Sequence, residues 1–155
     1  MDIEEEYDKI FRYCYWKVHN KEIAEDITQE TFLRFLQSNY DERGKRIRFL
    51  YTIAGNLCID EFRKKPFEDY SLDSSEKNGT TEDFFTQIYV KQILSQLAEE
   101  DRDLMIMRYI NRESITDICE VIGISRFALY RRLRGIKKVL AASGKGHIED
   151  EQNDQ

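Results

Sequence analysis

The chain has 155 residues, of which 35% are charged and 41% hydrophobic, with one proline and seven glycines. This composition is typical of a helical globular protein and excludes fibrous and collagen-like classes. The high charged fraction favours two small cores over one large enzyme core. No apolar run approaches the ~20 residues of a membrane-spanning helix, and the acidic start is unlike a signal peptide, so we expect a cytoplasmic protein.

The three cysteines show no metal-ligand spacing. Cys14, Cys58 and Cys119 include no Cys-x-x-Cys pair, and no histidine cluster lies near them. A zinc site needs several closely spaced sulfur or nitrogen ligands. We therefore expect no metal and no cofactor, and we predict that all three thiols are buried.

Charge is distributed unevenly, although the formal net charge is only -6. Residues 66–90 contain six acidic side chains and one basic side chain, whereas the stretch from Arg126 to Lys145 contains seven basic residues and no acidic one. An acid-free basic stretch suits a polyanion such as DNA. Because phosphate contacts supply most nonspecific affinity, an acidic chain of this kind is expected to need a partner in order to bind DNA.

Apolar residues recur at helical spacing in the first part of the chain. The pattern predicts a helix around 7–18, a second over 21–37 and a third from residue 46 to just before Pro66, since the residue before proline disfavours helix. In the second helix the residues predicted to point inward are Ile23, Ala24, Ile27, Phe35 and Leu36.

The stretch 66–83 is rich in Ser, Thr, Asp and Glu and opens with the only proline, which is typical of a linker. After it, helices are predicted around residues 85–97 and 99–110. The sequence therefore predicts an all-α protein of two small helical domains, residues 1–65 and 84–143. A flexible acidic linker at 66–83 joins them, and a disordered tail follows at 144–155.

The sharpest local pattern begins at Ser114, whose hydroxyl is placed to cap a helix by accepting from the N–H of Asp117. Gly123 permits the positive φ that ends this helix, and Ser125 can cap the next one. Two helices joined in this way predict a helix-turn-helix. In its second helix, steps of four, three and four residues place Leu129, Leu133, Ile136 and Leu140 in the core.

The other faces of that second helix carry cations and aromatic rings. A helix of this kind fits the major groove, where guanidinium groups contact guanine or phosphate. A solvated basic face is the alternative, although such faces usually mix both signs of charge. The candidate DNA-binding residues are Ser125, Arg126, Phe127, Tyr130, Arg131, Arg132, Arg134, Lys137 and Lys138.

Two stretches of the first domain carry a resemblance to a known family. AEDITQETFLRFL (24–36) and FLYTIAGNLCIDEFRKK (49–65), followed by the basic helix-turn-helix, resemble the extracytoplasmic-function sigma factors of the sigma-70 family of bacterial RNA polymerase. The resemblance spans about residues 7–141. It departs from the family at Gly55 and Gly135, where arginine is usual, and at Ala128, where threonine is usual.

In the first stretch, Asp26, Gln29 and Glu30 share one exposed helix face, which suits a basic partner. The resemblance implies that these three residues bind the clamp of the polymerase beta-prime subunit. An ordinary solvated face is one alternative. A catalytic carboxylate cluster is another, although no histidine lies near it.

The second stretch combines rings on which unpaired bases can stack with cations that can follow the DNA backbone. By resemblance, the first domain recognises and melts the minus-ten promoter element. Tyr40 and Tyr51 are the favoured stacking rings, whereas Phe49 could belong to the core and not contact a base. Asp60 and Arg63 could form an intrahelical pair. The candidates are Tyr40, Lys45, Arg46, Arg48, Phe49, Tyr51, Asn56, Asp60 and Arg63.

The resemblance thus implies a non-enzymatic transcription initiation factor. Its expected partners are core RNA polymerase, through the beta-prime clamp and the beta subunit, promoter DNA at the minus-ten and minus-thirty-five elements, and an anti-sigma factor. No small-molecule substrate and no membrane insertion are expected. The alternative is a stand-alone helix-turn-helix regulator whose N-terminal domain dimerises or senses a ligand.

Overall fold

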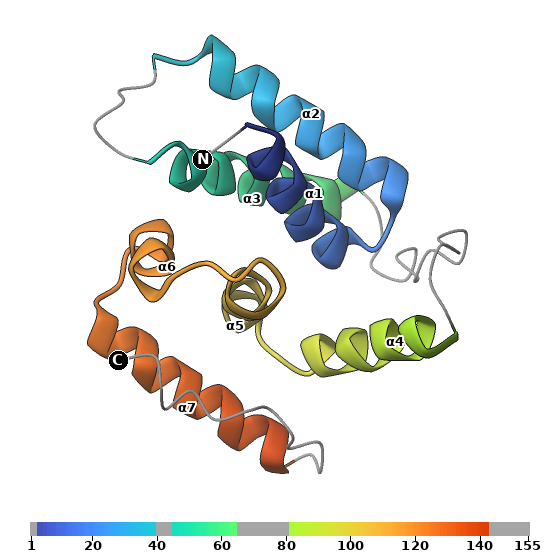
Figure 1. The fold of residues 1–155 in the computed structure, drawn as a ribbon, viewed down its shortest axis with the longest axis vertical. Helices are drawn as coiled ribbons and strands as arrows, with labels where there is room; N and C mark the ends of the chain where they lie inside the picture. The colour runs from blue at the N-terminus through green and yellow to red at the C-terminus, as the bar shows by residue number, and fades with distance from the viewer. Residues whose placement is uncertain (1–2, 40–44, 65–80, 143–155) are drawn as a thin grey trace. The chain divides into compact units, whose positions relative to one another are not determined.

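The computed structural model describes residues 3–39, 45–64 and 81–142, with side chains from residue 85 onward in the last range. The chain divides into two compact units, Met1–Asn78 and Gly79–Gln155. Every regular element in the described ranges is helical (Figure 1). The predicted all-α class with two helical domains is confirmed. Tyr40, most of the predicted linker and the predicted tail lie outside the described residues.

The first unit contains α1 (Ile3–Val18), α2 (Lys21–Gln37) and α3 (Arg46–Lys64), and each helix contacts the other two. His19 adopts a left-handed φ of 57° and donates its N–H to the Tyr15 carbonyl at 2.7 Å, which ends α1. Asn20 then caps α2 by accepting from the Ile23 N–H at 3.0 Å. These two caps reverse the chain within two residues, so that α2 packs against α1.

The core of the first unit is made of side chains from all three helices. Two aromatic rings close it, since Tyr13 of α1 meets Tyr51 of α3 edge to face with ring centroids 5.3 Å apart. The fully buried residues of this core include Ile10, Cys14, Val18, Ala24, Leu50, Ala54 and Cys58. This part of the predicted apolar pattern is confirmed.

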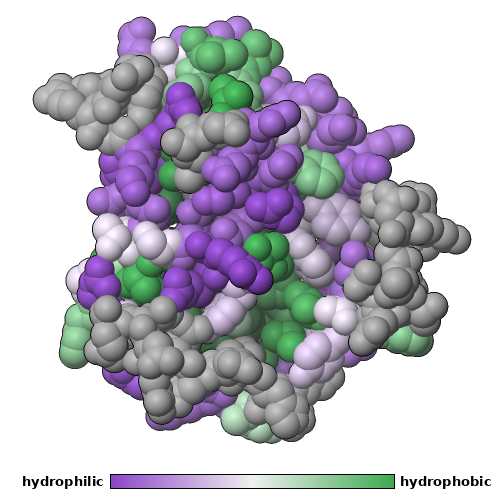
Figure 2. Space-filling model, in the orientation of Figure 1, coloured by the Kyte–Doolittle hydropathy of each residue, from purple (hydrophilic) through white to green (hydrophobic). Residues whose placement is uncertain are grey.

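One inward assignment in α2 is wrong. Leu36 is 72% exposed, because it lies seven residues after Gln29 and therefore on the outer face of the helix. Hydrophilic side chains cover much of the molecular face drawn in Figure 2, and hydrophobic side chains reach the surface between them. Leu36 is one of several large apolar side chains in the described ranges that are exposed to solvent.

The second unit contains α4 (Thr81–Ser95), α5 (Glu99–Met105), a π-helical turn (Ile106–Ile110), α6 (Ile115–Ile122) and α7 (Arg126–Ala142). Helix α4 begins at Thr81, so the last three residues of the predicted linker are helical. The segment predicted as one helix over 99–110 ends in the wider π turn, where the Asn111 N–H donates to the Ile106 carbonyl at 3.0 Å.

The helix-turn-helix forms as its sequence predicts. The Ser114 hydroxyl accepts from the Asp117 N–H at 3.0 Å, and Gly123 ends α6 with a left-handed φ of 83°. The Ser125 hydroxyl accepts from the Ala128 N–H at 3.0 Å and caps α7. The four predicted core residues of α7 are all buried: Leu129, Leu133, Ile136 and Leu140.

Cys14 and Cys58 are buried thiols as predicted, but Cys119 is partly exposed in α6. Its partial burial still raises the pKa of the thiol above the ordinary value, which keeps it protonated near neutral pH. No helix in the described ranges is both long enough and apolar enough to cross a membrane.

Substitution by alanine should have opposite effects on stability at the two glycines of the helix-turn-helix. Gly123→Ala forces a Cβ into the left-handed region at a cost of about 1 kcal/mol, with no steric neighbour within 4 Å to add to it. Gly135→Ala, inside α7 and equally open, should stabilise the helix by about 0.5–1 kcal/mol. Amide hydrogen exchange of α7 measures both changes. A left-handed turn of no energetic importance would leave exchange in Gly123→Ala unchanged.

Candidate functional site

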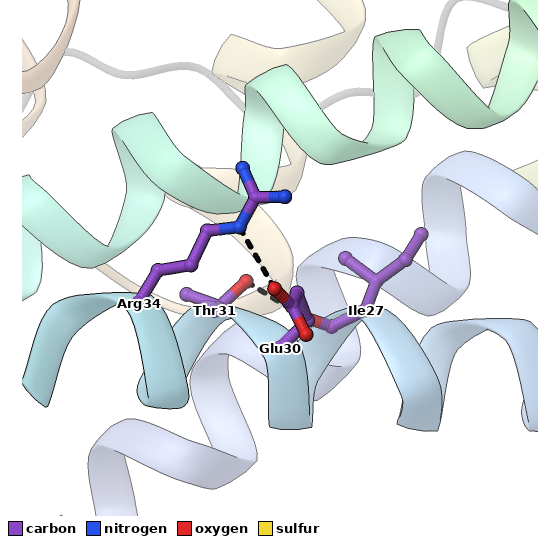
Figure 3. Close-up of polar contacts among 4 residues, drawn as sticks. All are labelled: Ile27, Glu30, Thr31 and Arg34. Atoms are coloured by element: carbon purple, nitrogen blue, oxygen red, sulfur yellow. Dashed lines mark hydrogen bonds and ion pairs between the residues drawn. The ribbon is translucent and has the colours of Figure 1, made fainter. Parts of the chain in front are cut away.

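Helix α2 presents the predicted acidic face to solvent. Asp26 and Gln29 are exposed and Glu30 is half-exposed, while Ala24, Ile27 and Phe35 are buried on the opposite side. Thr31 also lies on the inner side and is fully buried. Its hydroxyl donates to the Ile27 carbonyl at 2.7 Å (Figure 3). A hydroxyl satisfied by its own helix can be buried without a partner in another helix.

Glu30 is paired within the helix. The Arg34 Nε donates to the Glu30 Oε2 at 2.9 Å, one turn away (Figure 3). Both side chains remain about half-exposed, and exposed pairs at this spacing stabilise a helix by only a few tenths of a kcal/mol. A binding partner could therefore break this pair at little cost.

Two apolar residues extend the acidic face toward the C-terminal end of α2. Leu33 is 49% exposed and Leu36 is 72% exposed. Leu33 follows Asp26 by seven residues and Gln29 by four, so all three lie on one side of the helix. This extension was not predicted from the sequence, although Leu33 and Leu36 follow Gln29 by four and seven residues and so fall on its side of the helix. We call Asp26, Gln29, Glu30, Leu33 and Leu36 the α2 face.

Some of the predicted DNA-binding residues of α3 hold the helix in place, and others are exposed. Arg46 is anchored, because its Nε donates to the Glu6 Oε1 of α1 at 2.8 Å, and the Glu6 side chain is only 4% exposed. A buried carboxylate needs such a partner. The first duty of Arg46 is therefore to hold the start of α3 against α1.

The aromatic residues of α3 lie closer to the core than predicted. Tyr51 is 2% exposed, so the expectation that its ring stacks on a base is wrong: the ring is used against Tyr13. Phe49 is half-buried and meets Phe35 edge to face, with ring centroids 5.8 Å apart, which favours the alternative that Phe49 belongs to the core. Of the predicted stacking rings, only Tyr40 is left, and it lies outside the described residues.

Polar residues along the rest of α3 are accessible. Lys45, Asn56, Asp60 and Arg63 are exposed and Arg48 is half-buried. The predicted intrahelical pair exists, with the Arg63 Nη1 3.8 Å from the Asp60 Oδ1. Both side chains are more than half exposed, so the pair leaves them accessible to a ligand.

Helix α7 places most of its predicted DNA-binding residues at the surface. Arg126, Phe127, Arg131, Arg134 and Lys138 are exposed, and Lys137 is half-buried. Ser125 is exposed, but its hydroxyl is engaged in the α7 cap. Tyr130 is half-buried and its hydroxyl is buried.

Arg132 departs from the prediction. Its guanidinium lies 3.6 Å from the Glu100 Oε1 and 3.8 Å from the Asp101 Oδ1, both in α5. These contacts direct it away from the exposed basic side of α7 and tie that helix to α5. Arg131, Arg132 and Arg134 were all predicted to contact DNA, but the fold leaves Arg131 and Arg134 exposed and uses Arg132 as an anchor to α5.

The comparisons with known proteins match both units. Residues 3–66 match the model of sigma-70 region 2, and residues 87–140 match that of sigma-70 region 4. The chain is 31% identical over 137 residues to the ECF RNA polymerase sigma factor SigW of Bacillus subtilis (strain 168), covering 76% of this chain and 73% of SigW.

The chain belongs to the extracytoplasmic-function sigma factors of the sigma-70 family. It is a transcription initiation factor that directs RNA polymerase to promoters. Another relative is the ECF RNA polymerase sigma factor BldN of Streptomyces coelicolor, 28% identical over 149 residues, covering 86% of this chain and 56% of BldN. The RNA polymerase sigma factor YlaC of Bacillus subtilis is 27% identical over 154 residues, covering 88% of each chain.

Packing in this sigma factor explains its departure from the family at residue 55. A Cβ added to Gly55 would lie 3.1 Å from the Tyr13 hydroxyl oxygen, closer than ordinary van der Waals contact. The aromatic contact between Tyr13 and Tyr51 places that hydroxyl there. The same pair of rings thus fills the core and restricts residue 55.

In Arg46→Ala, the Glu6 carboxylate stays buried without this guanidinium, which should lower the free energy of unfolding by about 2 kcal/mol. Replacing both partners, as Glu6→Leu with Arg46→Met, should recover most of the loss because no buried charge is left. Urea denaturation followed by tyrosine fluorescence measures both variants. Wild-type stability in Arg46→Ala would refute the anchoring assignment.

Proposed function

We propose that this sigma factor binds core polymerase through the α2 face and contacts promoter DNA through α3 and α7. The observation that carries the proposal is the separation of charge: an acidic face with exposed leucines lies in one unit, and an acid-free basic helix lies in the other. An acidic surface repels DNA and suits a basic protein, whereas a basic helix suits DNA.

The α2 face is proposed to dock on the beta-prime clamp. Asp26 and Glu30 supply charge, Gln29 supplies hydrogen bonds, and Leu33 and Leu36 supply apolar area. Interfaces are stabilised mainly by apolar area that loses water, and charge steers the encounter. The weak Glu30–Arg34 pair allows Glu30 to exchange its partner for a cation of the polymerase.

Helix α3 is proposed to read the minus-ten element through Lys45, Arg48, Asn56, Asp60 and Arg63, which are all at least partly exposed. Tyr40 remains the proposed stacking ring. Phosphate contacts from cations fix register, while an unstacked base needs a ring or amide to receive it. Arg46 contributes by positioning the first turn of α3.

Helix α7 is proposed to enter the major groove at the minus-thirty-five element. Its first turn carries Arg126 and Phe127, where recognition helices contact base edges, and Arg134 and Lys138 follow toward its C-terminal end. Ser125 contributes by fixing the start of the helix. Residues 1–65 and 84–143 are thus proposed as separate functional domains.

The polymerase supplies the chemistry in this proposal, so the sigma factor needs no catalytic residue and acts in the cytoplasm, where the polymerase works. Among the described residues, no group of three His, Cys, Asp or Glu side chains could hold a metal ion. An anti-sigma factor is proposed as a further partner. A surface that binds polymerase, such as the α2 face, is one that an inhibitor can compete for.

Run-off transcription on a random promoter library tests the function as a whole. With core polymerase added, the chain should yield transcripts from a subset sharing two sequence elements, because DNA affinity of the acidic chain depends on the core. DNase footprinting without core should show no protected site. A specific footprint from the chain alone would favour a stand-alone helix-turn-helix regulator.

Charge reversal tests the docking surface. Asp26→Lys with Glu30→Lys should weaken capture by core polymerase at least tenfold, since two attractive contacts become repulsive. Glu5→Lys with Asp8→Lys, on the exposed side of α1, gives the same change in net charge and should bind like wild type. Circular dichroism checks that helix content is preserved in both. Equal losses in both double variants would mean that net charge alone, and not the α2 face, governs binding.

A further inference from the structure

Phe127 is one of the large apolar residues that the described ranges leave exposed. It lies in the first turn of α7 and is 71% exposed, although a phenylalanine normally gains stability by burial. The ring therefore contributes little to the core and is available for contacts at the surface.

The Phe127 ring has a partner one turn later. The guanidinium carbon of Arg131 lies over the ring, 5.3 Å from its centroid. A cation within about 6 Å of a ring centroid is attracted by the negative face of the ring. A guanidinium over an aromatic face keeps its N–H groups for hydrogen bonds in its own plane, so the contact orients Arg131 without consuming its donors.

The other arginines near this position are fixed by different contacts. The Arg126 Nη2 donates to the Thr116 Oγ1 of α6 at 2.8 Å, and Arg132 faces the carboxylates of α5. Arg131 is thus the arginine that this part of α7 holds by a ring and leaves exposed. Each of these three arginines therefore has a different partner in the fold: a hydroxyl, two carboxylates or an aromatic ring.

We propose that Phe127 is a positioning residue that holds Arg131 for a bidentate contact with one guanine of the upstream promoter element. This inference rests on the proposed role of α7 in the major groove. A phosphate accepts a cation from many directions, whereas the O6 and N7 atoms of guanine require a guanidinium in one plane and orientation. Pre-orientation by the ring reduces the side-chain entropy that Arg131 loses on binding.

The test uses holoenzyme made from the full chain and core polymerase, on a promoter library randomised in the upstream element. Wild type should select a G·C pair at one position. Arg131→Ala should reduce that preference about tenfold, as expected for loss of one bidentate contact. Phe127→Leu, which keeps an apolar side chain but removes the ring, should weaken the same preference about threefold.

Two further variants make the test specific. The double variant Phe127→Leu with Arg131→Ala should be no worse than Arg131→Ala alone, because the ring acts through the guanidinium. Arg132→Ala is the matched control and should leave base preference unchanged. The salt slope of promoter binding should stay close to the wild-type value in both Arg131→Ala and Phe127→Leu, because the slope reports phosphate contacts and Arg131 is proposed to contact a base. A slope that falls by about one in Arg131→Ala would instead make Arg131 a phosphate contact.

Several results would overturn the inference. If Phe127→Leu selects the wild-type sequence with undiminished preference, the ring positions nothing. If Phe127→Leu relaxes the preference at a different base pair, Phe127 is itself a direct contact. Additive losses in the double variant would also contradict a shared role. If wild-type holoenzyme selects no upstream sequence at all, the proposed role of α7 fails as well, and that failure is recognised without any variant.

Discussion

Each unit of this protein has to build a core from a few short helices, and this constraint determines which residues are left for binding. In the first unit, Ile10, Leu50 and Ala54 are fully buried at the meeting of three helices. Such a core uses only one side of each helix, so the remaining sides are free to differ in charge and chemistry. The α2 face and the basic side of α7 are the sides that the cores leave over.

Local signals allowed much of the fold to be predicted from the sequence. The bounds of α2 follow from helical periodicity, and the turn between α6 and α7 follows from Ser114, Gly123 and Ser125, each of which acts through neighbours within four residues. Interactions between residues so close in sequence can be predicted without knowledge of the tertiary structure. The resemblance to a sigma factor added the function that these local features could not specify.

The errors occur where a side chain chooses between partners far apart in sequence. Tyr51 was expected to face DNA and instead packs on Tyr13, 38 residues earlier, and Arg46 pairs with Glu6, 40 residues earlier. Arg132 was predicted to contact DNA with the other cations of α7, but its guanidinium lies against the carboxylates of Glu100 and Asp101 in α5. A sequence pattern shows which residues can bind nucleic acid, but tertiary packing decides which of them are already occupied.

The contact between Gly55 and Tyr13 has a consequence for how this protein can change over evolution. Gaining a side chain at residue 55 displaces the tyrosine hydroxyl, whereas a prior change of Tyr13 to phenylalanine removes the oxygen that stands in the way. The two positions are therefore coupled, and a side chain at residue 55 costs less once the interior residue has changed. Which side chains this point of α3 can carry on its surface therefore depends in part on a buried residue of α1.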